Sequence, residues 1–221
     1  MLQVTNLQFH YPESGFQLSL PSWMVPEGEQ AALIGPSGSG KTTLLSLLAG
    51  ILQPEAGEIE LLGKPLHQMS ETERRNLRIS QCGLIFQSFE LIPYLNVVQN
   101  IQLPYYLNPV LERSSDVEFR AYQLAEQLGL SSYLQNRVTS LSVGEQQRLA
   151  ICRALITQPQ VILADEPTAS LDQTNAERVM DVLFEYSREQ KAMLIMSTHD
   201  PALFTLFEHR LDFASLVSSP V

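Results

Sequence analysis

Cysteine, positive charge and long apolar runs are all scarce in this sequence. Its 221 residues include two cysteines, Cys82 and Cys152. So few thiols predict no disulfide framework, and both suit a reducing compartment as small core residues. Lys and Arg number 14 against 24 Asp and Glu, which gives a formal net charge of −10. Because binding to nucleic acid phosphates needs clustered cations, this acidity argues against nucleic acid as the partner.

The apolar segments are too short to cross a membrane. The densest, Leu44–Leu52, falls far below the roughly 20 residues that span a bilayer. The start of the chain, Met1–Tyr11, lacks the basic start and apolar core of a signal peptide. We therefore expect any role at a membrane to come through a partner. Hydrophobic residues make up 44% of the sequence, enough for the core of one large domain and too many for a disordered chain.

Short apolar runs and turn residues predict strands that alternate with helices. The first segment resembles antiparallel strands, at Leu2–Phe9, Leu18–Leu20 and Gln30–Ile34. Further strands are predicted at Glu58–Leu62, Cys82–Phe86, Val161–Ala164 and Met193–Met196, of which the last two are continuous apolar runs typical of burial on both faces. Strands that alternate with helices favour a parallel sheet, so we predict an α/β fold.

Helices are predicted from capping residues and apolar periodicity. They cover Lys41–Ala49, ended by Gly50; a segment from Ser70 to Leu77, with Ser70 and Glu73 as a capping box; and a helix with Val179, Val182, Leu183 and Tyr186 on one face. The middle, from Ser88 to Ser140, is expected to be largely helical. Phe119, Tyr122, Ala125 and Leu128 recur there every three residues and predict one buried helix face that ends at Gly129.

The strongest local signal is GPSGSGKT at Gly35–Thr42, which matches the phosphate-binding pattern G-x-x-x-x-G-K-[ST]. Glycines let the backbone wrap closely around a phosphate, Lys41 supplies a positive charge, and the Thr42 hydroxyl can bind Mg²⁺. A chance match is disfavoured because a predicted strand precedes the loop and a helix follows it. The nucleotide contacts predicted here are Gly35, Pro36, Ser37, Gly38, Ser39, Gly40, Lys41, Thr42 and Thr43.

Two carboxylates follow the apolar run Val161–Ala164. Asp165 and Glu166 would lie at the carboxyl edge of the sheet, where ligands bind in open α/β folds. There Asp165 would hold Mg²⁺ and Glu166 would polarise the attacking water. The alternative is that the two acids merely cap the turn at Pro167 and Thr168. With the phosphate loop upstream, these residues indicate a P-loop nucleotide hydrolase.

Residues Ser140–Arg148, SLSVGEQQR, resemble the signature motif of ATP-binding cassette (ABC) proteins and lie shortly before the strand that carries the two carboxylates, as in that family. Four further elements match the family in order: Tyr11, placed as the adenine-stacking aromatic; Gln87, placed as the Q-loop glutamine; Ala169–Asp172, which resembles the D-loop; and His199, which resembles the switch histidine. The segments GPSGSGKTTLL and ILADEPTASLD look most like those of the branch that contains the LolD, MacB and FtsE ATPases.

The resemblance implies one ABC ATPase domain over residues 1–221, with an ABC-type P-loop NTPase core (1–87 and 153–221) that includes an N-terminal antiparallel β-subdomain, and an inserted helical subdomain (88–152). It implies ATP and Mg²⁺ as cofactors. The implied roles are catalysis by Glu166, His199 and Gln87; metal binding by Thr42, Gln87 and Asp165; and contacts to nucleotide by Tyr11, Ser142, Gly144, Glu145 and Asp172.

The resemblance also implies partners. These are a second copy of the chain, bound head-to-tail through the nucleotide sites, and membrane permease subunits that contact the region Ser88–Asn100, whose apolar residues look exposed. The chain would then work on the cytoplasmic face of the inner membrane. Two alternatives stay open: an FtsE-like ATPase that transmits a conformational change without transport, and a soluble ABC ATPase acting on DNA or ribosomes, which the acidity and the lack of long insertions disfavour.

Two departures from the family pattern stand out. Val143 replaces the first of two usual signature glycines, and the tail Leu211–Val221 is short and lacks glycine, which leaves the cover of the last sheet edge open. Four of the assigned residues also have ordinary structural alternatives. Tyr11 could be a half-buried strand aromatic and Gln87 a polar strand end. Ser142 could be a helix cap and His199 a loop histidine.

Overall fold

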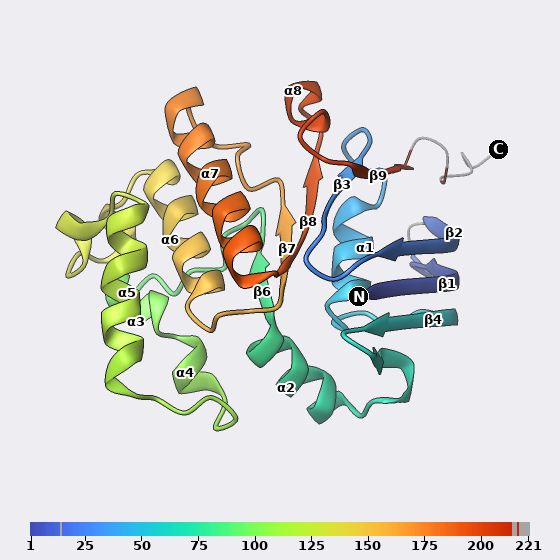
Figure 1. Ribbon diagram of the computed structural model, residues 1–221, viewed down its shortest axis with the longest axis horizontal. Coiled ribbons are helices and arrows are strands. Elements are labelled where there is room, and N and C mark those ends of the chain that lie inside the picture. The colour runs from blue at the N-terminus through green and yellow to red at the C-terminus, as the bar shows by residue number, and fades with distance from the viewer. Residues whose placement is uncertain (14, 214–215, 217–221) are drawn as a thin grey trace.

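The computed structural model describes residues 1–13, 15–213 and 216, and it confirms an α/β fold. One antiparallel and one parallel sheet lie side by side, with helix α1 (Lys41–Leu48) between them (Figure 1). The helical segment that follows residue 88 packs on the far side of the parallel sheet from the antiparallel one (Figure 1). The sequence did not determine how the tail Leu211–Val221 covers the edge of the sheet. Most of this tail, residues 214–215 and 217–221, lies outside the described residues.

The antiparallel sheet has the strand order β2-β1-β4-β5. Its strands are β1 (Leu2–His10), β2 (Gln17–Val25), β4 (Ala56–Leu61) and β5 (Lys64–Pro65). Alternate residues of β1, among them Leu2 and Val4, are buried against α1, as expected of a sheet that faces a core on one side. The register between β1 and β4 shifts between Thr5 and Gln8, so the strand bends there.

The parallel sheet has the strand order β6-β7-β8-β3-β9. Its strands are β6 (Cys82–Ile85), β7 (Val161–Asp165), β8 (Met193–Thr198), β3 (Gln30–Ile34) and β9 (His209–Asp212). The prediction that Gln30–Ile34 belongs with the antiparallel strands is wrong: β3 pairs in parallel with β8 and β9. A run with apolar residues on both faces fits a sheet covered on both sides. Strand β9 forms the edge beside β3.

The helices of the core follow their sequence signals. Ser70 and Glu73 form the predicted capping box, and α2 (Glu71–Gln81) runs on beyond Leu77 to the start of β6. Helix α1 ends before Gly50, which adopts a positive φ of 64° as expected after a helix. The remaining core helices are α6 (Val143–Leu155), α7 (Gln173–Gln190) and the short α8 (Pro201–Phe204).

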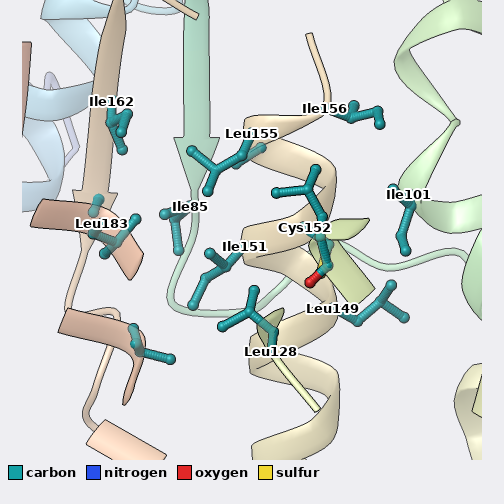
Figure 2. Close-up of a cluster of buried hydrophobic side chains, with 14 of the residues drawn as sticks. Ile85, Ile101, Leu128, Leu149, Ile151, Cys152, Leu155, Ile156, Ile162 and Leu183 are labelled. Atoms are coloured by element: carbon teal, nitrogen blue, oxygen red, sulfur yellow. The ribbon is translucent and has the colours of Figure 1, made fainter. Parts of the chain in front are cut away.

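Neighbouring residues of β3, β7 and β8 belong to different cores, because successive strand side chains point to opposite faces. Ile162 packs with Leu155 of α6 and Leu183 of α7 in the core drawn in Figure 2. Leu163 packs on the other face with α1 and the antiparallel sheet. The two sets of apolar contacts hold the carboxyl end of β7 between α1 and α6, where Asp165 ends the strand and Glu166 follows it.

The middle segment is only partly helical. It contains α3 (Val97–Ile101), α4 (Pro104–Leu107) and α5 (Ser115–Gln127), and 3₁₀ turns at Ser131–Tyr133 and Val138–Ser140. A further 3₁₀ turn, Leu66–Gln68, lies earlier in the chain. Within the described residues, no helix has both the length and the hydropathy that are needed to cross a membrane.

The predicted face of α5 is wrong. Phe119 and Tyr122 are exposed, with relative accessibilities of 65% and 41%. A step of three residues stops about 60° short of a full helical turn, so three such steps from Leu128 reach the opposite side of the helix at Phe119. The buried face instead mixes steps of three and four residues: Val117, Ala121, Leu124, Ala125 and Leu128.

The region Ser88–Asn100 is also less exposed than its sequence suggests. Of its five apolar residues that look exposed in the sequence, only Tyr94 is, at 75% relative accessibility. The other four are half-buried: Phe89, Leu91, Ile92 and Leu95. Asn100 is fully buried and bonds the main chain of Ile92, which folds the segment back onto α3.

Candidate nucleotide site

The candidate site lies at the carboxyl edge of the parallel sheet, where β3, β7 and β8 end side by side. The pairs Ile34↔Thr198 and Asp165↔Ser197 set these ends level. The loop after β3 is the glycine-rich segment Gly35–Gly40, and it leads directly into α1. This is the edge at which open α/β sheets bind ligands.

Two glycines of the loop have conformations that other residues tolerate poorly. Gly38 has a φ of 78° with open space beside it, and Gly40 has a φ of 101° at the start of α1. A Cβ at Gly40 would lie 2.4 Å from the ring of Phe16, so a side chain would also clash. Among the described residues, no side chain caps the start of α1 and no acidic residue lies in its first turn, so its N–H groups and helix dipole are available to an anion.

The loop encloses a buried cation and a buried hydroxyl. The Lys41 ammonium is 5% exposed and donates hydrogen bonds of 2.8 and 2.9 Å to the carbonyls of Gly35 and Pro36. It lies 3.9 Å from Oε1 of Glu166. Ser39 Oγ is buried and has no hydrogen-bond partner among the described residues. Since buried polar groups are normally satisfied, this cradle fits a phosphate.

Asp165 is held by two hydroxyls from other elements. Thr42 Oγ1 donates a 2.6 Å hydrogen bond to Oδ2, and the Ser197 hydroxyl donates to Oδ1. A carboxylate and a hydroxyl are ligands suited to Mg²⁺, which usually keeps several waters and binds only one or two carboxylates together with substrate phosphates. The described residues contain no cluster of three or more His, Cys, Asp or Glu that could hold a metal alone, so Thr42 and Asp165 fit that sparser mode.

Glu166 lies in a strained but well-supported conformation. Its φ of 48° is unusual for a residue other than glycine. Its N–H donates to the carbonyl and the hydroxyl of Ser197, at 3.2 and 3.0 Å. Its carboxylate, 12% exposed, lies 3.1 Å from Nδ1 of His199. The main-chain bonds aim the carboxylate at the space between Lys41 and His199.

A hollow of about 300 Å³ lies beside Lys41, Thr42 and Glu166. Tyr11, Gln87 and Glu166 line it together with the phosphate loop, as does Phe16. The Tyr11 ring packs edge-on against Phe9, with ring centroids 4.8 Å apart. The structure therefore brings Tyr11, Gln87 and most of the phosphate loop together with Glu166. His199 and Glu166 also line an adjoining hollow of about 340 Å³.

The signature residues and Asp172 do not line the nucleotide hollow in this single chain. Ser142 caps α6 in a capping box: its Oγ accepts from the N–H of Glu145 and donates to the Glu145 carboxylate. The Ser142 N–H also donates a 2.7 Å hydrogen bond to the Glu145 carboxylate, and this bond, together with the one from the Ser142 hydroxyl, lowers the pKa of Glu145. Asp172 caps α7 through the N–H of Asn175. The helix-cap alternative for Ser142 is therefore correct as a structural role.

Three residues of the site were not assigned from the sequence. Ser197 and Gln147 lie inside segments that the resemblance covers, yet only the fold shows their contacts: Ser197 bonds both carboxylate residues, and the Gln147 amide donates to the carbonyls of Glu166 and Pro167. Phe16 follows a turn and belongs to no pattern. It reaches the site because β2 is antiparallel to β1 and returns beside Tyr11.

Comparisons with known proteins assign most of this chain to one family. Residues 18–169 match the family described as ABC transporter. The chain is 47% identical over 177 residues to the ABC transporter ATP-binding protein YbbA of Escherichia coli (strain K12), covering 80% of this chain and 77% of that one. It is 38% identical to the lipoprotein-releasing system ATP-binding protein LolD of Hydrogenovibrio crunogenus, covering 90% and 87%. The dimeric ATP-binding cassette MJ0796, solved with ADP and Pi, matches with a TM-score of 0.88 and 29% identity over 96% and 94% of the chains.

Proposed function

This chain belongs to the ABC transporter family, and from that premise we propose that it is the ATP-hydrolysing subunit of a membrane transporter whose transmembrane helices belong to a separate chain. The observation that carries the proposal is the meeting of Lys41, Asp165 and Glu166 at one end of the parallel sheet. The relative named as a lipoprotein-releasing system ATP-binding protein favours transport over signalling alone.

The phosphate loop and the start of α1 bind the triphosphate. Lys41 exchanges its bonds to the loop carbonyls for phosphate oxygens, and the buried Ser39 hydroxyl gains the partner that it lacks among the described residues. Thr42 and Asp165 would hold Mg²⁺, with Gln87 in the lining of the hollow that Thr42 also lines. When bound, the ion supplies positive charge to the phosphate oxygens.

Glu166 orients the attacking water. Its main-chain N–H donates to Ser197, and its carboxylate lies within hydrogen-bond distance of Nδ1 of His199. A carboxylate fixed in this way accepts a hydrogen bond from water and places the water oxygen toward the terminal phosphate. His199, 61% exposed, lies beside the Glu166 carboxylate. We expect it to keep this carboxylate turned toward the water and to contact the terminal phosphate.

The second face of the phosphate is supplied by another copy of the chain. Ser142, Gly144 and Glu145 begin α6, a helix of 13 residues whose N-terminus carries a partial positive charge. They lie outside the hollow of their own chain, and the dimeric structure of the related cassette supports a pair of chains, which we propose to be arranged head-to-tail. The residue before Asp172 lies against the start of α6, because a Cβ on Gly144 would be 3.2 Å from the Leu171 side chain.

The membrane partner docks in a groove of about 460 Å³ between α2, β6 and α4. Phe86, Ile92 and Leu107 supply apolar lining, and Arg75, Arg78 and Arg153 supply positive charge. The segment Ser88–Asn100 contributes to this groove through Glu90 and Ile92. The groove lies where the core 1–87 and 153–221 meets the helical segment 88–152. Helix α6 crosses this division. We propose that the chain binds the membrane partner on the cytoplasmic face of the inner membrane.

Purification of the chain from detergent-solubilised membranes, followed by identification of the protein that comes with it, tests this proposal. A permease whose presence changes Mg²⁺-dependent ATP hydrolysis supports it. A membrane partner with no transport activity in vesicles would instead favour an ATPase that only transmits a conformational change. The variant Ile92→Ser, within the groove, should weaken this association, whereas Phe119→Ser, on the exposed side of α5 and outside the groove lining, serves as its control.

A further inference from the structure

We propose that Phe16 is a second aromatic wall of the nucleotide site, which holds the nucleobase and ribose together with Tyr11. This inference rests on the proposed function, because it concerns the same hollow. Both rings line that hollow. Their centroids are 6.0 Å apart with an interplanar angle of 45°, so the rings are tilted toward each other and not stacked face to face.

The position of Phe16 is fixed from two sides. The Tyr11 N–H donates a 3.1 Å hydrogen bond to the Phe16 carbonyl, which closes the turn between β1 and β2. On the other side the ring lies against Gly40: a Cβ there would come within 2.4 Å of Cζ and 3.0 Å of Cε2. The same ring therefore touches the start of α1, where the phosphates would bind, and the turn that carries Tyr11.

The chemistry of the lining decides what this end of the hollow recognises. Its polar residues come from the phosphate loop, the start of α1, Gln87 and Glu166, whereas Tyr11 and Phe16 present ring surface. Ring surface binds any nucleobase by stacking and does not read the hydrogen-bonding edge of the base. We therefore expect larger purine rings to bind better than pyrimidines, with little distinction between ATP and GTP.

Binding of ATP, CTP and inorganic tripolyphosphate to the whole chain, measured by calorimetry, tests the role of Phe16. The variant Phe16→Ala should weaken ATP binding about tenfold, the loss of one stacking contact, and reduce the preference for ATP over CTP. Tripolyphosphate binding should stay within about twofold, because it needs only the phosphate cradle. The variant Phe16→Tyr, which keeps the ring, should restore ATP affinity.

Three outcomes would overturn the inference. Equal losses for ATP and tripolyphosphate would mean that Phe16 only supports the loop at Gly40; the variant Phe16→Leu, which keeps apolar bulk there, would then behave as wild type. A gain in ATP affinity would mean that the ring occupies the nucleotide position. Unchanged ATP binding would mean that it does not touch the nucleotide. Failure of the wild-type chain to bind ATP at all would instead contradict the proposed function.

Discussion

The hydroxyl of Thr42 donates a 2.6 Å hydrogen bond to the carboxylate of Asp165, although 123 positions separate the two residues in the chain. Thr42 lies in the first turn of α1 and Asp165 ends β7. The bond joins the phosphate loop to the two carboxylates, and it sets the pair of oxygens that we assign to Mg²⁺.

Replacing Lys41 with Ala should weaken ATP binding about ten- to a hundredfold, because a charge-assisted hydrogen bond to phosphate is lost. Calorimetry with the purified variant measures this. Lys64→Ala removes an equal charge from the exposed strand β5 and should bind ATP as the wild type does. Equal affinity in the Lys41 variant would show that the cradle is assigned wrongly.

Glu166→Gln should keep ATP binding and nearly stop hydrolysis. Glutamine has almost the same shape, so the main-chain bonds to Ser197 persist, while the charge that polarises water is lost. The variant should therefore accumulate as an ATP-bound dimer, visible by size-exclusion chromatography with and without ATP. A variant that remains monomeric and hydrolyses ATP at the normal rate argues against both the catalytic role and the dimer.

Ser197→Ala should raise the Mg²⁺ concentration needed for half-maximal hydrolysis. The change removes the donor to Asp165 and one acceptor for the Glu166 N–H in a fully buried position, which should also lower the free energy of unfolding by about 1–3 kcal/mol. Ser19→Ala, on the exposed face of β2, is the control. If only stability changes and the Mg²⁺ dependence does not, Ser197 is a packing residue.

Val143→Gly should leave hydrolysis intact or raise it, whereas Ser142→Arg should abolish it. Val143 is 55% exposed at the first position of α6, so the change removes bulk near the expected phosphate at a cost of about 1 kcal/mol in backbone entropy. At position 142 a small hydroxyl gives way to a long side chain at the helix N-terminus. ATPase rates, measured with the membrane partner present, test both. An active Ser142→Arg variant would show that this helix end does not face nucleotide.

Glu145 should make the stability of α6 depend on pH. Hydrogen bonds from Ser142 and Tyr133 lower the pKa of this carboxyl below its usual 4.5. The folded state therefore binds the proton more weakly than the unfolded state, so the contribution of Glu145 is complete above about pH 4.5 and disappears as the pH falls through the lowered pKa. Thermal unfolding of the wild type and Glu145→Gln should differ most at neutral pH and converge in acid. A difference that does not depend on pH would mean that the charge contributes nothing.

Contiguous features were predictable from the sequence. The phosphate loop, the capping box at Ser70 and the stop at Gly50 each depend on residues within about one helical turn, and each appears where its local chemistry requires. The fold class followed as well, because fully apolar strands that alternate with helices have few other ways to bury both faces. The roles given to Tyr11, Gln87 and His199 came from the resemblance and not from their own surroundings.

Other features depended on tertiary structure. A short apolar run does not determine which strands it pairs with. Strand β3 could therefore be placed in the parallel sheet only from its pairing with β8 and β9. A three-residue repeat did not fix the buried face of α5, because the face depends on what packs against it. Likewise Ser197 holds Asp165, and Phe16 meets Gly40, because strand pairing brings distant segments together. Local chemistry fixes turns, caps and the loop that binds phosphate, whereas long-range pairing decides which side chains complete the site.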